Sequence, residues 1–172
     1  TWLGSLQNRR YFTSLLALAR EESSTPEEAL APFVISLSGE TIRLALLLCE
    51  DSWDENYSFS PMDVLSAKGS DLFLNLSASP FTLSKNEKRH RMLSAKLSRL
   101  HVPMLYVNRR GLENNGKTCY TFDGMTAAYG KDGGLLAEAA PFEEARSTFH
   151  FETSTGTLLP ASPMPPWQGD LL

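Results

Sequence analysis

Cysteine and histidine are scarce in this sequence. Two cysteines in 172 residues are too few for a disulfide framework, and no Cys-x-x-Cys pair indicates a zinc site. The three histidines are scattered and form no spacing that is typical of metal ligands. We therefore expect a reduced, cytoplasmic compartment and no metal bound to this chain.

Long apolar runs and an excess of positive charge are also missing. No segment approaches the roughly 20 apolar residues that span a bilayer, and no charged segment before an apolar one indicates a secretory signal. A net charge of −4 gives no basic footprint of the kind that nucleic-acid binders show. We expect a single globular domain that binds neither membrane nor nucleic acid, since its 42% hydrophobic and 21% charged residues are ordinary for one.

The two ends of the sequence differ from its middle. The first residue is Thr1, and residues 160–172 are rich in proline. We expect both ends to have been cut from a longer chain. The expected organisation is a partial domain over residues 1–150 and a linker over residues 151–172.

Apolar periodicity and turn residues predict the elements between these ends. The apolar run over residues 41–48 is expected to be a strand buried on both faces, paired in a hairpin with residues 33–37. Residues 85–100 predict a basic amphipathic helix with Met92 and Leu93 on its buried face, and with residues 89–91 on a solvated face or in a subunit contact. Further helices are expected over residues 11–19, from residue 25 and over 61–68, and further strands over 72–76, 104–107, 118–122, 125–129 and 135–139. Alternating helices and strands early, and hairpins late, predict an α/β fold with a mixed sheet.

Cys49 is the first candidate for a chemical role. Free cysteine is usually buried and inert. Cys49, however, ends an apolar strand and is followed by the polar residues 50–52, so it should lie at the carboxyl edge of a sheet, where open α/β folds bind ligands. Asp51 and Asp54 either form a paired-carboxylate site or, as we favour, cap the turn. Cys119 lies in a predicted strand and is expected in the core.

Several segments, in this order, resemble one known family. They are Leu-Leu-Cys-Glu-Asp-Ser-Trp-Asp around Cys49, Asn-Leu-Ser-Ala-Ser-Pro-Phe at residues 75–81, a basic stretch at 85–91, Tyr-Val-Asn at 106–108, Tyr-Thr-Phe-Asp-Gly at 120–124 and Phe-Glu-Glu at 142–144. Together they are similar to the nitrilase-type, glutamine-hydrolysing domain of glutamine-dependent NAD synthetases over roughly residues 10–144. The resemblance implies an α-β-β-α sandwich of two sheets, of which this chain holds the C-terminal two thirds.

The same resemblance implies a reaction. In that family a cysteine thiolate attacks the side-chain amide of glutamine, a glutamate is the general base, a lysine stabilises the oxyanion and a thioester forms. The ammonia passes to an ATP-dependent synthetase domain of the same chain, which amidates nicotinic acid adenine dinucleotide. No cofactor is implied for the glutaminase part, whereas the synthetase domain needs ATP and magnesium. A homo-oligomer is also implied.

The resemblance implies a site made of five residues. Cys49 matches the nucleophile, and the backbone amide of Glu50 would help to form the oxyanion hole. Ser79 and Lys85 match positions that hold the amino-acid end of the substrate, and Trp53 falls where an aromatic residue lines the pocket. Other interpretations remain: Ser79 before a proline can shape a turn, Lys85 can be one more solvated base, and Trp53 can be plain core.

The sequence also departs from the family. The catalytic lysine would fall just ahead of Thr1 and the glutamate further upstream, so this chain alone is expected to be inactive. Gln7 and Asn8 stand where the family often has an acidic residue. Two alternatives follow: a stand-alone nitrilase-type amidase without a synthetase partner, and a degenerate domain kept for contacts or regulation.

Overall fold

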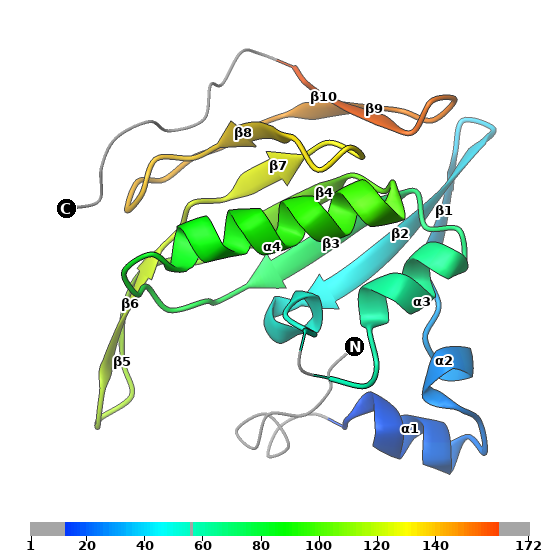
Figure 1. Ribbon diagram of the computed structural model, residues 1–172, viewed down its shortest axis with the longest axis horizontal. Coiled ribbons are helices and arrows are strands. Elements are labelled where there is room, and N and C mark those ends of the chain that lie inside the picture. Colours follow the sequence, from blue (N-terminus) through cyan, green and yellow to red (C-terminus); the bar gives the residue numbers. More distant parts are fainter. Residues whose placement is uncertain (1–12, 56, 162–172) are drawn as a thin grey trace.

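The computed structural model describes residues 13–55 and 57–161, which are built around one twisted six-stranded sheet (Figure 1). Its strands are β1 (Phe33–Leu37), β2 (Glu40–Leu48), β3 (Leu72–Ser77), β4 (Met104–Asn108), β7 (Ala127–Tyr129) and β8 (Leu135–Glu138). They lie in the order β1-β2-β3-β4-β7-β8; β2, β3 and β4 are parallel, and the outer pairings are antiparallel. The mixed sheet expected from the sequence is confirmed.

The helices begin at polar capping residues. They are α1 (Leu15–Glu21), α2 (Pro26–Ala29), α3 (Pro61–Ala67) and α4 (Lys85–Leu100). The Thr25 side chain accepts from the Glu28 N–H while the Glu28 carboxylate accepts from the Thr25 N–H. At the start of α3 the Ser60 side chain accepts from the Asp63 N–H. The predicted helix starts at Thr25 and Ser60 are confirmed. The expected first helix begins later than predicted, at Leu15, and residues 11 and 12 lie outside the described part of the chain.

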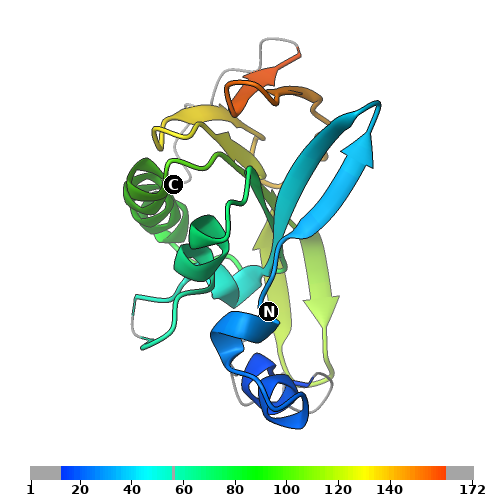
Figure 2. The ribbon, with the colours of Figure 1, turned by 90° about the vertical axis from the view of Figure 1, so that its right-hand side faces the viewer.

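Helices α3 and α4 cover one face of the sheet, and the main core lies between them (Figures 1 and 2). Leu47, Phe73 and Met104 point from the strands into this core, where Leu93 and Leu97 of α4 meet them. These side chains are fully buried, so this layer supplies most of the apolar burial that stabilises the described residues.

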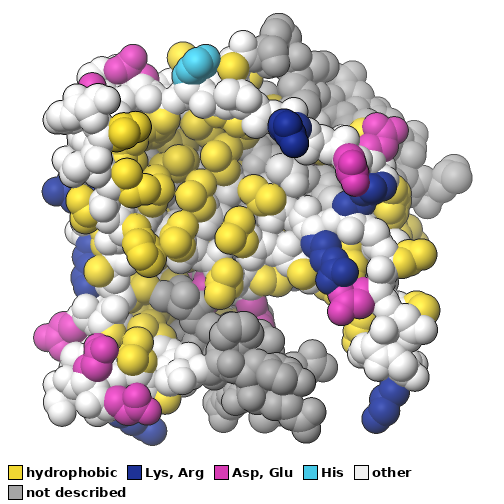
Figure 3. Space-filling model, turned by 180° about the vertical axis from the view of Figure 1, so that it is seen from behind, with side chains coloured by type: hydrophobic (Ala, Val, Ile, Leu, Met, Phe, Trp, Pro, Cys, Tyr) yellow, Lys and Arg dark blue, Asp and Glu magenta, His cyan; other side chains and the backbone are white. Residues whose placement is uncertain are grey.

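The opposite face of the sheet is largely uncovered among the described residues. Leu46, Leu48, Leu76 and Val107 are exposed there, and Figure 3 shows the apolar side chains gathered over it. The expectation that β2 is buried on both faces is therefore wrong, because only its α3–α4 side is covered by described residues. We define this uncovered surface as the open sheet face.

A C-terminal hairpin covers one end of that face. It consists of β9 (Phe149–Glu152) and β10 (Thr157–Pro160), and Leu158 packs with Leu72 and Ala128 in a second, smaller core. The expected domain boundary after residue 150 falls inside β9. Residues 151–160 therefore belong to the folded part of the chain; residues 162–172, also assigned to the linker, lie outside the described residues.

A second hairpin extends from the edge of the molecule (Figure 1). It joins β5 (Arg110–Asn114) to β6 (Cys119–Asp123) through the predicted turn, in which Gly116 has a φ of +85°. Cys119 lies in the strand but is exposed, so its expected core position is wrong. Among the described residues the two strands form a sheet of their own, and the Phe81 N–H donates to the Thr121 carbonyl at 2.7 Å. Separately, no helix within the described ranges is both long and apolar enough to cross a bilayer.

Candidate active site

Cys49 lies where β2 ends and a 3₁₀ turn, η2 (Cys49–Ser52), begins. Its neighbours in the sheet, β3 and β4, are parallel to β2, so the carboxyl ends of three strands meet at this edge. Cys49 is half-buried and has a φ of +42°, in the left-handed region that non-glycine residues rarely adopt. Such backbone strain is often found at functional sites.

Buried polar side chains hold the η2 turn. The Asp51 carboxylate accepts a hydrogen bond from the Leu48 N–H at 2.8 Å, and the Ser52 hydroxyl donates to the Cys49 carbonyl at 3.1 Å. Asn75 on β3 donates to the Ser52 hydroxyl at 3.0 Å and in turn accepts from Ser77 at 2.6 Å. The conformation of Cys49 is therefore fixed from two strands.

The loop after η2 is tied to helix α4. Asp54 forms an ion pair with Lys96, and the Ser60 hydroxyl donates to the Asp54 carboxylate at 2.5 Å. Both charged side chains are almost completely buried. Asp54 thus joins the segment that follows the nucleophile candidate to the helix layer, which agrees with the turn-orienting role expected for it.

Lys85, the first residue of α4, is close enough to Cys49 for the two side chains to interact electrostatically. Its ammonium donates to the Pro80 carbonyl at 3.0 Å. Burial lowers the pKa of Lys85, and the charge of Arg89 lowers it further, while Cys49 and Asp123 act in the opposite direction. The lysine is therefore part of the polar surroundings of the thiol rather than a freely solvated base.

Ser79 is buried in the loop between β3 and α4. Its backbone N–H donates to the Asn108 side chain at 3.0 Å, and the Asn108 amide donates to the Asp123 carboxylate at 3.1 Å. Burial raises the pKa of Asp123, while the charges of Arg89 and Lys85 oppose that rise. Ser79 is thus held in place by a series of buried hydrogen bonds. It shapes the turn, and it also has a fixed position beside the site.

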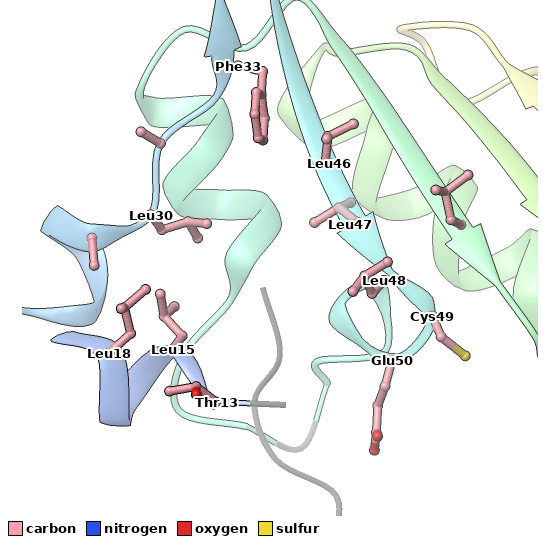
Figure 4. Close-up of a pocket in the computed structure, with 13 residues that line it drawn as sticks. Thr13, Leu15, Leu18, Leu30, Phe33, Leu46, Leu47, Leu48, Cys49 and Glu50 are labelled. Carbon is pink, nitrogen blue, oxygen red and sulfur yellow. The ribbon is translucent and has the colours of Figure 1, made fainter. Parts of the chain in front are cut away.

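A cavity of about 750 Å³ lies between the end of β2, including Cys49, and the N-terminal segment with α1 and α2 (Figure 4). Leu15, Leu18 and Leu30 of the N-terminal segment face β2 across it, and Figure 4 shows the Cys49 sulfur extending away from them. Because an amino acid carries two charged end groups, this apolar cavity suits it poorly. The side with Ser79 and Lys85 is the better candidate for a polar substrate.

No protein-family model matches the sequence. Curated proteins do match it: over 126 residues the chain is 29% identical to a glutamine-dependent NAD(+) synthetase from Synechocystis sp., covering 69% of this chain and 22% of the relative. A synthetase of the same name from Thermotoga maritima is 34% identical over 104 residues, which are 60% of this chain and 17% of the relative.

The chain is therefore similar to part of the glutamine-dependent NAD(+) synthetases. It spans about a fifth of the length of these relatives. The structure is similar to a solved glutamine-dependent NAD+ synthetase from Acinetobacter baumannii, with a TM-score of 0.67 and 23% identity over 96% of this chain and 27% of that one. A carbon-nitrogen hydrolase from Helicobacter pylori gives a TM-score of 0.55 at 22% identity, over 67% and 41%. These two likenesses confirm the nitrilase-type α/β fold.

Of the five predicted site residues, Cys49 and Glu50 lie at the edge of the sheet, and Lys85 and Ser79 lie beside them on α4 and in the loop before it. The Glu50 side chain accepts from the Tyr57 hydroxyl at 2.8 Å. Trp53 instead packs against the main core with the Lys88 ammonium 5.7 Å from its ring centroid, which favours the core interpretation.

Sequence reasoning missed the buried residues behind the site. Arg89 was expected on a solvated helix face, but it is only 1% exposed. Its spacing of four residues from Lys85 on one helix was the available signal, because positions i and i+4 share a face. Asn108 and Asp123 belong to segments that carry the family resemblance, yet their roles appear only in three dimensions. Within the described residues no group of three His, Cys, Asp or Glu could hold a metal ion.

Proposed function

We propose that this chain is the part of a glutamine-dependent NAD synthetase that hydrolyses glutamine, with Cys49 as the nucleophile. The observation that supports it best is the position of Cys49, which lies in a strained backbone conformation at the carboxyl edge of the sheet. The names of the homologous synthetases add glutamine as the substrate.

In the proposed reaction the Cys49 thiolate attacks the side-chain amide carbon of glutamine, and a C–S bond forms. The C–N bond then breaks, and the nitrogen leaves as ammonia after it takes a proton. Water attacks the resulting thioester, releases glutamate and returns the thiol. The backbone N–H of Glu50 donates to the oxygen that becomes negative in both tetrahedral intermediates.

Ser79 and Lys85 are proposed to hold the amino-acid end of glutamine. An ammonium such as that of Lys85 can pair with the α-carboxylate, and a hydroxyl can bind either end group. The buried chain from Ser79 through Asn108 to Asp123 would keep this end of the site in place. Trp53 contributes through packing beside the turn.

The general base and the oxyanion lysine of the family are not identified in this sequence. We therefore propose that the 172 residues alone hydrolyse glutamine poorly or not at all. The ammonia would be consumed by a synthetase domain that uses ATP and magnesium to amidate nicotinic acid adenine dinucleotide. A cytoplasmic location and a homo-oligomer stay predictions.

The test is glutamate release by the full-length gene product, with and without nicotinic acid adenine dinucleotide and ATP. Cys49→Ala should abolish release, whereas Cys119→Ala, which changes an exposed cysteine, should leave it intact. Cys49-dependent cleavage of other amides but not of glutamine would support a stand-alone amidase. Absence of any cleavage would support a degenerate domain, and normal turnover by the 172-residue chain would contradict its proposed inactivity.

A further inference from the structure

Arg89 is a buried cation that the reaction described above does not use. It lies one helical turn after Lys85 on α4, and only 1% of its surface is exposed. Its Nη1 donates to the Asn86 side chain at 2.8 Å, and its Nε and Nη2 find no acceptor within residues 13–55 and 57–161. Burying a guanidinium with so few hydrogen bonds is costly, so its neighbours must account for it.

One neighbour is the ring of Tyr106 on β4. The Arg89 guanidinium carbon lies 4.7 Å from the centroid of that ring, which is a favourable cation–π distance. Tyr106 is fully buried, and its hydroxyl is close to Ser77 and Ser79, although it makes no hydrogen bond of normal geometry within the described ranges. The guanidinium therefore packs on the ring that lies next to the Ser79 loop.

The second neighbour is Asp123. Burial raises the pKa of this carboxyl, and the Arg89 charge is the strongest opposing influence. The other charged groups that act on it are Lys85, from the same helix, and Glu138, from β8. The Asp123 carboxylate accepts from Asn108, and Asn108 accepts from the Ser79 N–H, so the ionised form of Asp123 orients the amide that holds Ser79.

Two routes from Arg89 therefore meet at Ser79, one through the Tyr106 ring and one through Asp123 and Asn108. We propose that Arg89 is a positioning residue that fixes the Ser79 end of the substrate pocket and does not touch the substrate. The inference rests on the function proposed above, because Ser79 has this role only if the site binds an amino acid. Arg89 itself is held through Asn86. The Asn86 side chain accepts from Arg89 and donates to the Glu138 carboxylate on β8 at 2.9 Å.

The experiment compares Arg89→Gln with wild type in the full-length gene product, with Arg99→Gln as the matched control. Arg99 lies on the same helix, but it is exposed and pairs with Asp63 at the surface. Arg89→Gln should raise the KM for glutamine about tenfold with a smaller change in kcat, as expected when a charged hydrogen-bond system near the substrate is loosened. It should also move the acid limb of kcat/KM to higher pH, because the carboxyl of Asp123 loses its main stabilising charge.

Two more variants keep the test decisive. Arg89→Lys keeps the charge, so it should leave the acid limb near the wild-type position while KM rises. Asp123→Asn imitates the protonated carboxyl without changing its size, so it should raise KM. In the double variant, Arg89→Gln should then have a smaller effect on KM, because only the route through Tyr106 remains, and no effect on the acid limb. If Arg89→Gln does not fold, the Lys and Asn variants decide the question.

The outcomes separate this inference from the proposed function. Wild-type protein that fails to hydrolyse glutamine overturns the proposed function and this inference with it. Active, Cys49-dependent wild type together with an unchanged KM and acid limb in Arg89→Gln overturns only the role of Arg89. Equal effects of Arg89→Gln and Arg99→Gln would likewise overturn it.

Discussion

At the scale of single residues, the charge of Lys85 interacts both with the Cys49 thiol and with the buried charges of Arg89 and Asp123. Its pKa is lowered from 10.5 by burial and by the charge of Arg89, and it is held up by Cys49 and Asp123. The ammonium therefore loses its proton at a lower pH than an exposed lysine does. The pairing with a substrate carboxylate that we propose for Lys85 would hold below that pKa and be lost as pH rises through it.

We predict from this that Lys85→Gln raises the KM for glutamine about tenfold at neutral pH, because a charged partner of the carboxylate is lost. Lys85→Arg should keep binding and move its alkaline loss to higher pH, since a guanidinium stays charged. The pH dependence of KM in the full-length gene product measures both effects. Lys117→Gln, in the exposed β5–β6 turn, is the control, and an unchanged KM in Lys85→Gln would remove Lys85 from the substrate site.

The role of a residue was predictable from the sequence only where its neighbours in the chain indicated that role. The end of an apolar strand and the polar residues after it made Cys49 the first candidate for a chemical role, and the family resemblance added the role of nucleophile. Arg89 was misplaced because a basic segment indicates solvent, whereas its burial depends on Tyr106 and Asp123, which lie on other elements. Such long-range pairing of a charge with a ring and a carboxylate leaves no signal in local sequence.

At the scale of elements, the segment between β2 and α3 depends on one buried ion pair. Asp54 and Lys96 join it to α4, with side chains 4% and 10% exposed. A pair of this kind is weak evidence for net stability, but breaking it leaves a buried charge without its partner. The position of the loop after Cys49 should therefore be sensitive to one side chain.

We predict that Asp54→Asn lowers the free energy of unfolding by about 3 kcal/mol, because Lys96 stays buried without a counter-charge. The control is Asp63→Asn, which removes the surface pair with Arg99 and should cost less than about 1 kcal/mol. Urea denaturation followed by tryptophan fluorescence measures both variants. Equal midpoints for the two would show that the buried pair does not hold the loop.

Most elements followed from apolar periodicity and capping residues. The predicted helix over residues 85–100 coincides with α4, and the predicted hairpin of residues 33–48 is formed by β1 and β2. Burial was harder to predict than element type. An apolar run shows what a strand can bury, but the covering layer is set elsewhere, as the exposed Leu46 and Leu48 show.

At the scale of the whole molecule, the open sheet face is its least usual surface. Leu48, Leu76 and Val107 are between 43% and 52% exposed on neighbouring strands, and the strand β1 beside them is exposed along its length. Contiguous apolar surface of this kind favours association in water. The 172-residue chain on its own should therefore bind to itself through this face.

We predict concentration-dependent self-association of the 172-residue chain in analytical ultracentrifugation. Replacing Leu48 and Leu76 together by lysine should shift the population toward monomer, because charge on this face opposes its burial. Leu83→Lys is the control, since this 70% exposed residue lies in the loop before α4 and not on a strand of the sheet. A monomer at all concentrations, or an equal effect of the control, would contradict the prediction.

At Cys49 the residue that the proposed chemistry needs and the residue that would give the most stable fold are different, because its backbone is left-handed. Glycine adopts a φ of +42° without the steric cost that a side chain imposes, so Cys49→Gly should unfold at a higher urea concentration than wild type while losing the thiol. The best residue for folding at this position is then not the residue that the chemistry needs. A screen of variants for thermal stability alone would select against the nucleophile.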